Sequence, residues 1–144
     1  MDNRDTIYLL KECNSGCKSA TSSMEQVMGY VKNEKLRDLI KRYLDKHIKI
    51  GDVCHDVLNE MNENEKDPSK VAMMFAELGT DLKLMMEQST HKAADMLIDG
   101  CTMGIKSLSE YINKYPNAKQ DVQELAKKLI KIEQDFMTEL LVYL

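Results

Sequence analysis

Apolar residues recur over residues 10–61 at alternating intervals of three and four positions. Such intervals place side chains on one face of an α-helix, so the pattern predicts helices that each bury one face. We predict one helix over 5–32 and a second over 34–62, joined by a very short turn into an antiparallel hairpin. The first stripe consists of Leu10, Cys13, Cys17, Ala20, Met24, Val27 and Val31, and the second of Leu36, Ile40, Tyr43, His47, Ile50, Cys54, Val57 and Met61.

Polar residues stand where the helices are expected to begin. The side chains of Asp5 or Thr6, and that of Asn33, can accept hydrogen bonds from the free backbone N–H groups of a first helical turn. Asp67 followed by Pro68 predicts a further start, because proline at the first helical position has no N–H group to satisfy.

The second proline marks where the next helical stretch ends. Residues 68–115 carry helical periodicity, and Ser89 or Thr90 can begin a new helix, so this stretch is either two helices or one long kinked helix. Pro116 ends it because proline disrupts a helix interior. Asn117 is expected to cap the last helix, with the glutamine three positions later completing a capping box.

No segment shows sustained alternation of apolar and polar residues, so no sheet is predicted. We expect a single domain over 1–144, made of a first hairpin over 5–62, a helical crossover over 63–89 and a second hairpin over 90–144. Two hairpins joined by a long crossover form the ferritin-like topology. The predicted fold is therefore all-α: a ferritin-like four-helix bundle of two antiparallel helical hairpins.

An internal repeat supports this division. The segment CNSGCKS at 13–19 matches CTMGIKS at 101–107 in its cysteine, glycine, lysine and serine, and the helices that follow align with His47 on Glu133. The segments LLKECNSG and DGCTMGIKSL, which contain these motifs, resemble a family of bacterial ferritin-like four-helix bundles. The resemblance covers most of the chain and rests on packing motifs. It implies the bundle fold and supplies no activity.

The six glycines all fall within predicted helices. A glycine there costs about 1 kcal/mol relative to alanine, so we expect close approach between helices to compensate. The pair Gly100 and Gly104 is the best candidate for such a crossing. The full set is Gly16, Gly29, Gly51, Gly79, Gly100 and Gly104.

Composition excludes several classes of protein. The chain has 144 residues and a net charge of −4, and this mild acidity argues against nucleic acid as the main partner. The longest apolar run covers 71–76, far shorter than the roughly 20 residues of a membrane helix. The four cysteines are spread through a chain that can stabilise itself by burial, which is typical of a reducing, cytoplasmic setting.

A ferritin-type di-iron centre would need a Glu from each of two helices and Glu-x-x-His from the other two. The second helix offers only Asp52 and His55 in that spacing, and the last helix contains no histidine. The di-iron pattern is therefore incomplete in both hairpins.

A reduced metal site is the sharper alternative. Five potential ligands lie at similar distances from the two hairpin turns and so at similar heights in the bundle, where thiolate and imidazole could bind Fe, Zn or Cu. Buried cysteines more often act as small apolar residues, and a single histidine on an apolar stripe more often hydrogen-bonds a neighbour, which would leave the protein without a metal. The five candidates are His47, Glu133, Cys17, Cys101 and Asp99.

Three functions follow from this picture. The first is a binding or interaction module without a catalytic site. The second is a transition-metal-binding or redox protein that uses the reduced site, and the third is a small-molecule binder with a cavity between the hairpins. Surplus apolar residues in the crossover also suggest a homodimer, through Met73, Met74, Phe75, Met85 and Met86.

Overall fold

A computed structural model describes residues 3–65 and 90–144 of the chain. Over these two ranges the chain is helical and contains no strand, which confirms the predicted all-α fold with four helices. A short 3-10 helix, η1, follows the last α-helix. The elements are α1 (Arg4–Met28), α2 (Glu34–Glu60), α5 (Thr90–Lys114), α6 (Gln120–Leu140) and η1 (Leu141–Tyr143).

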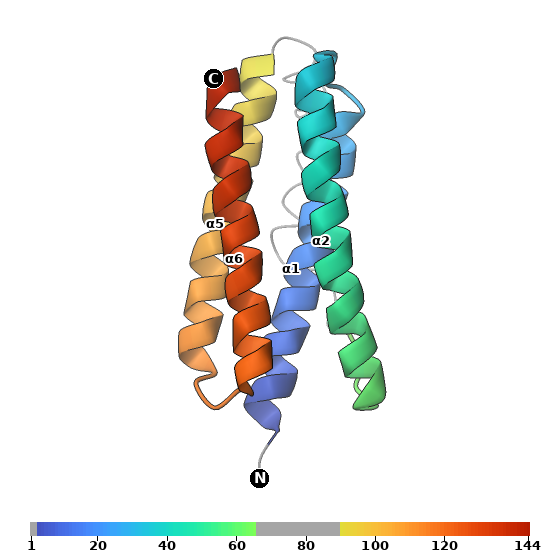
Figure 1. Cartoon of the computed structure of the whole chain (residues 1–144), viewed down its shortest axis with the longest axis vertical. Coiled ribbons are helices and arrows are strands. Elements are labelled where there is room, and N and C mark those ends of the chain that lie inside the picture. Colours follow the sequence, from blue (N-terminus) through green and yellow to red (C-terminus); the bar gives the residue numbers. More distant parts are fainter. Residues whose placement is uncertain (1–2, 66–89) are drawn as a thin grey trace.

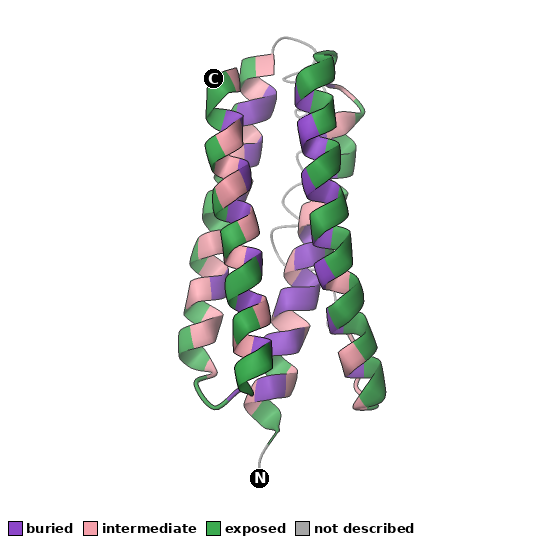
Figure 2. Cartoon of the chain, viewed as in Figure 1, coloured by how far each residue is buried: buried purple, intermediate pink, exposed green. Residues whose placement is uncertain are grey.

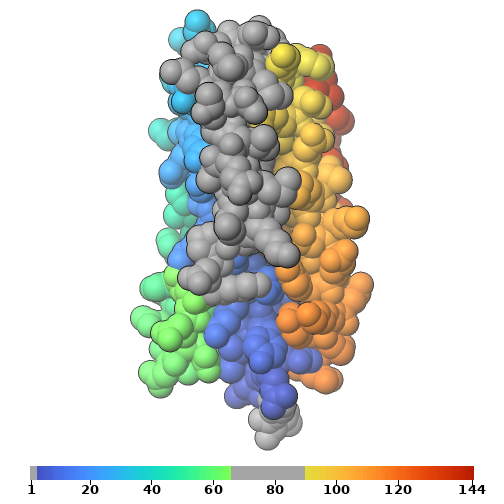
Figure 3. All heavy atoms as spheres, turned by 180° about the vertical axis from the view of Figure 1, so that it is seen from behind, coloured from blue at the N-terminus to red at the C-terminus, as the bar shows by residue number. Residues whose placement is uncertain are grey.

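The four helices lie along one long axis (Figure 1). The chain ascends along α1 from the end marked N, descends along α2, descends again along α5 and ascends along α6. α1 packs most extensively against α2, and α5 packs most extensively against α6. From the opposite side, α1 is seen between α2 and α5 (Figure 3).

The core consists of two apolar clusters stacked along the bundle, with buried faces turned inward (Figure 2). Along α2, the first cluster includes Leu44 and the second begins at Ile50. Along α6, Leu129 belongs to the second cluster and Phe136 to the first. The short stretch between the clusters on each helix holds a buried polar residue, and these two residues form the site described below. Both stripes predicted for the first hairpin are largely buried.

The N-cap of the first helix lies two to three residues earlier than predicted. Asn3 is its N-cap residue, so the prediction of Asp5 or Thr6 is wrong. Both side chains have partners outside α1: Asp5 Oδ2 accepts from the N–H of Asn117 at 3.0 Å, and Thr6 Oγ1 accepts from the N–H of Lys119 at 2.9 Å. The first turn of α1 therefore holds the connection between α5 and α6.

Three further helix ends differ from prediction, and one agrees. α2 ends at Glu60 rather than at residue 62. α1 ends at Met28 rather than at residue 32, which leaves Gly29 in the turn and not inside a helix. Asn33 caps α2 as predicted, accepting from the N–H of Leu36 at 3.0 Å. Lys119, not Asn117, is the N-cap residue of α6, because Asn117 belongs to the turn that α1 engages.

Several predictions fall on residues outside the described ranges. They concern most of the 63–89 crossover, the start at Asp67 and Pro68, the choice between one kinked helix and two, Gly79 and the methionine-rich surface expected at a homodimer contact. The homodimer stays a prediction.

Candidate functional site

A histidine and a glutamate meet in the middle of the bundle, between the two apolar clusters. His47 of α2 is 1% exposed and Glu133 of α6 is 6% exposed. The imidazole Nε2 hydrogen-bonds Glu133 Oε1, and the imidazole Nδ1 lies 2.6 Å from the backbone carbonyl of Tyr43. A carbonyl oxygen can only accept, so Nδ1 carries a proton and donates it. Both ring nitrogens of His47 are thereby engaged.

The pair is electrostatically coupled. Burial by itself lowers the pKa of His47, because a charged imidazolium loses solvation in the core. The hydrogen bond and charge of Glu133, together with the Tyr43 carbonyl, more than offset this, and the pKa of His47 is raised above its usual 6.5. The structure thus favours an imidazolium that donates from both nitrogens to a carboxylate and a carbonyl.

A glycine on the facing helix makes room for this carboxylate. A Cβ added at Gly104 of α5 would lie 3.1 Å from Glu133 Oε2 and 3.5 Å from its Cδ. Gly51 is similar, since an added Cβ would lie 3.3 Å from the Cβ of Cys17. Gly16 is different, because an added Cβ would meet nothing within 4 Å. The expected close approach therefore holds at Gly104 and Gly51 and is wrong at Gly16.

Two cysteines lie beside the pair. Burial raises the pKa of the Cys101 thiol, and the charge of Glu133 and a hydrogen bond to it raise that pKa further. Burial also raises the pKa of Cys17, with smaller contributions from neighbouring thiols and from Glu133. The structure thus brings together four of the five residues singled out from the sequence. Asp99 is exposed, because it lies two positions before Cys101 and so on the other side of α5.

The arrangement does not offer a ready set of metal ligands. Within 3–65 and 90–144, no group of three or more His, Cys, Asp or Glu side chains is placed to hold a metal ion. His47 has both nitrogens engaged, and the raised pKa values of Cys17 and Cys101 keep their thiols neutral, whereas metals bind the thiolate. Metal binding at these residues stays a prediction that the geometry does not favour.

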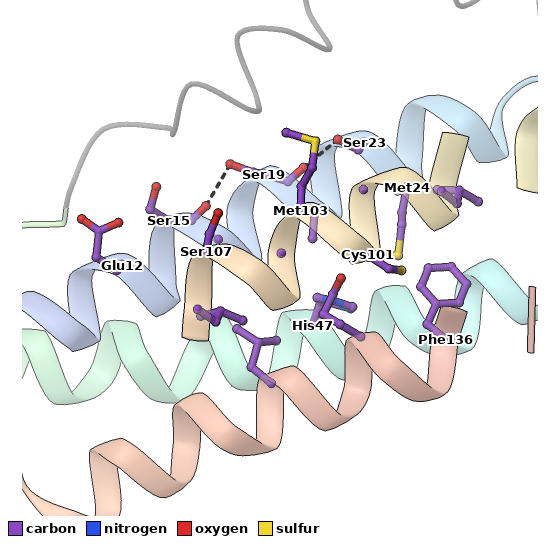
Figure 4. Close-up of a pocket in the computed structure, with 18 of the residues that line it drawn as sticks. Glu12, Ser15, Ser19, Ser23, Met24, His47, Cys101, Met103, Ser107 and Phe136 are labelled. Atoms are coloured by element: carbon purple, nitrogen blue, oxygen red, sulfur yellow. Dashed lines mark hydrogen bonds and ion pairs between the residues drawn. The ribbon is translucent and has the colours of Figure 1, made fainter. Parts of the chain in front are cut away.

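A cavity of about 510 Å³ lies over the His47–Glu133 pair, with walls from α1 and α5. Its apolar lining includes Met24, Leu97, Leu129 and Phe136. Figure 4 shows Ser15, Ser19 and Ser23 following one another along α1, with Cys101, Met103 and Ser107 coming from α5. Other small residues that line the cavity are Gly16, Ala20, Gly100 and Gly104.

The serines on α1 contribute to the cavity through their size and their hydrogen bonding. Ser19 Oγ donates to the carbonyl of Ser15 at 3.0 Å, and Ser23 Oγ donates to the carbonyl of Ser19 at 2.9 Å. The hydroxyl groups of Ser19 and Ser23 therefore donate to backbone carbonyls of α1 itself. Sequence analysis missed these residues, although serines at intervals of four beside an apolar stripe are a visible signal of a narrow, small-residue helix face.

No helix in the described part of the chain is both long and apolar enough to cross a membrane. Comparison with protein-family models finds no match to the chain, and comparisons with curated proteins and with solved structures find none either.

Proposed function

We propose that this chain is a binding protein that holds one small, largely apolar molecule in the cavity between α1 and α5. The observation that carries the proposal is the cavity itself, which combines apolar walls with a buried ionic pair. Its volume of about 510 Å³ lies within the range typical of sites for small molecules, roughly 300–1,000 Å³. Such sites fix the orientation of a ligand with a few polar groups.

The polar groups available indicate the chemistry of the ligand. Glu133 Oε1 is engaged by His47, and Glu133 also lines the cavity. A carboxylate has about four lone-pair positions, so Glu133 can accept a further hydrogen bond from a ligand hydroxyl or N–H group. The ligand that fits is a neutral molecule with an apolar body and one hydrogen-bond donor, because an added charge would be costly to desolvate beside the pair.

We further propose that the helices form two antiparallel hairpins with ferritin-like topology. The directions of the four helices in Figure 1 support this, since α2 and α5 both descend and a long connection must return between them. In this proposal the His47–Glu133 pair occupies the place in the core where ferritin-like proteins hold metal ligands, and it serves as the polar floor of a ligand cavity.

The proposal is tested with N-phenyl-1-naphthylamine, a neutral fluorophore with one N–H donor whose emission increases in apolar surroundings. Gly16→Leu places a large side chain in the cavity without a clash at its Cβ, because nothing lies within 4 Å of that position. Gly29→Leu is the matched control, since Gly29 is exposed in the turn after α1 and does not line the cavity.

The wild-type chain is expected to bind the fluorophore saturably, with one molecule per chain. Gly16→Leu should weaken this binding by at least about tenfold, the effect of roughly 1.4 kcal/mol, and Gly29→Leu should leave it unchanged. Circular dichroism confirms that both variants are folded. Absence of saturable binding by the wild-type chain, or equal binding by the two variants, would refute the proposal.

A further inference from the structure

A second cavity, of about 330 Å³, lies between α1 and α2. It shares only His47 with the cavity between α1 and α5. Its walls are more polar: Lys18 comes from α1, His55 from α2, and Glu65 from the segment that follows α2. The remaining lining residues are Asn14, Cys17, Thr21, Ile48, Gly51 and Asp52.

The chain itself supplies a carboxylate to this cavity. After α2, Asn62 adopts a left-handed backbone conformation with φ 57°, and the N–H of Glu63 donates to the carbonyl of Leu58 at 2.9 Å. Asparagine tolerates this conformation better than most residues, and it reverses the chain at the helix end. Glu65 then contacts α1 and α2. Its Oε2 accepts from Lys18 Nζ and its Oε1 pairs with His55 Nδ1.

One nitrogen of a buried side-chain amide in the same cavity has no well-formed hydrogen bond. Asn14 is 1% exposed, and its Nδ2 is the one buried side-chain nitrogen or oxygen in the described ranges without a hydrogen bond. The side chain of Asn14 faces Glu65, and its hydrogen-bonding contribution lowers the pKa of that carboxyl by less than Lys18 and His55 do, although no acceptor meets Asn14 Nδ2 with hydrogen-bond geometry. Buried donors are nearly always paired in folded proteins, so an unpaired donor that lines a cavity points to a missing acceptor.

We propose that the cavity between α1 and α2 is a carboxylate-binding site that Glu65 occupies within the chain, and that a small molecule bearing a carboxylate binds there in place of Glu65. Lys18 Nζ and His55 Nδ1 would bind the incoming oxygens as they bind those of Glu65. Asn14 Nδ2, which has no well-formed hydrogen bond to Glu65, would donate one to the ligand carboxylate. The body of the ligand would fill the space beside Ile48 and Gly51.

The charges around the cavity favour a carboxylate over a phosphate. Lys18 and His55 are the basic groups of the lining, and Asp52 and Glu65 are the acidic groups. The lowered pKa of Glu65, about 2, keeps that residue ionised at neutral pH. Exchange of one monovalent carboxylate for another leaves the net charge of the cavity unchanged. A phosphate dianion would add negative charge beside Asp52, which is unfavourable.

The experiment uses sodium acetate as the probe, with ionic strength held constant, and follows the side-chain amide signal of Asn14 in ¹H–¹⁵N spectra of the full chain. Glu65→Gln removes the competing carboxylate while keeping its size. Glu63→Gln is the matched control, because Glu63 pairs with Lys11 at 3.5 Å and does not line the cavity. Sodium phosphate is titrated in parallel.

Glu65→Gln is expected to bind acetate with an apparent Kd at least about tenfold lower than that of the wild-type chain, because an internal competitor reduces the fraction of open sites. Glu63→Gln should behave as the wild-type chain does. Phosphate should bind more weakly than acetate to Glu65→Gln. Within the Glu65→Gln background, Lys18→Met and Asn14→Leu should each abolish the saturable response.

The proposal is wrong if Glu65→Gln and wild-type chains respond alike to acetate, or if the response survives Lys18→Met. Tighter binding of phosphate than of acetate would also overturn the assignment to carboxylates. Lys18 is half-exposed, so its replacement keeps the fold even where Asn14→Leu disturbs the buried face of α1. In the Lys18→Met and Asn14→Leu arms the response is read from the backbone amides that flank Gly51, because Asn14→Leu removes the side-chain amide signal.

Discussion

Replacing Glu133 with glutamine should reverse the pH dependence of stability that His47 confers. In the wild-type chain the folded-state pKa of His47 lies above 6.5, the unfolded value. The folded chain therefore holds a proton that the unfolded chain releases. The stabilisation is fully present below pH 6.5 and is lost as the pH rises through the raised pKa.

The variant removes the charge that raises this pKa. Burial, the largest influence on His47, then lowers its pKa below 6.5, so the variant loses stability as the pH falls. Each slope is at most about 1.4 kcal/mol per pH unit, because one proton is involved. Breaking a buried ion pair costs roughly 3–5 kcal/mol, and the glutamine amide can still hydrogen-bond the neutral imidazole, so we expect a loss of about 3 kcal/mol at pH 6.

The assay is urea denaturation at several values between pH 5 and pH 8, combined with ¹H–¹³C spectra that follow the titration of His47. Glu139→Gln is the matched control, because Glu139 also lies on α6 and accepts a hydrogen bond from Tyr43 without contacting His47. It should keep the wild-type slope. The reasoning is refuted if the free energy of unfolding of Glu133→Gln still decreases as the pH rises from 6 to 8. It is also refuted if His47 titrates at the same pH in both chains.

Three further predictions concern packing, accessibility and helix ends. Gly16→Ala should stabilise the fold by about 1 kcal/mol, and Gly104→Ala should be neutral or destabilising by up to about 2 kcal/mol, because its Cβ meets Glu133; equal effects in thermal unfolding would contradict this. The four cysteines are buried, and burial raises their pKa values, so iodoacetamide should modify them only in denaturant, as mass spectrometry would show; rapid modification of the native chain would disprove it. Asn33→Ala should cost about 1 kcal/mol, measured by urea denaturation, because the Leu36 N–H loses its acceptor; an unchanged midpoint would show that the cap contributes nothing.

The helical faces could be predicted from the sequence because burial itself produces the three-and-four spacing. His47 and Glu133 could also be brought together, since residues at equal distances from a turn lie at equal heights in neighbouring antiparallel helices. Height does not determine the direction of a side chain, however. Asp99 is predicted at nearly the same height as Cys101, but Asp99 is exposed on α5 whereas Cys101 is buried.

The cavities and several helix ends depend on partners distant in sequence. A glycine in a helix indicates a missing side chain, and only the neighbouring helix decides whether the space is filled, as at Gly104, or open, as at Gly16. Asp5 and Thr6 have the composition of caps for their own helix, yet they bind backbone groups 112 and 113 positions away. Spacing within one segment carries no information about such partners.

The contacts of Asp5 and Thr6 join α1 to the connection between α5 and α6. The N–H groups of Asn117 and Lys119 gain their acceptors only when α1 is docked against the second pair of helices. Their hydrogen exchange with solvent is therefore governed by the separation of α1 from the connection between α5 and α6, and not by fraying of α6 alone. The exchange rates of these two amides therefore measure how often α1 separates from the connection between α5 and α6.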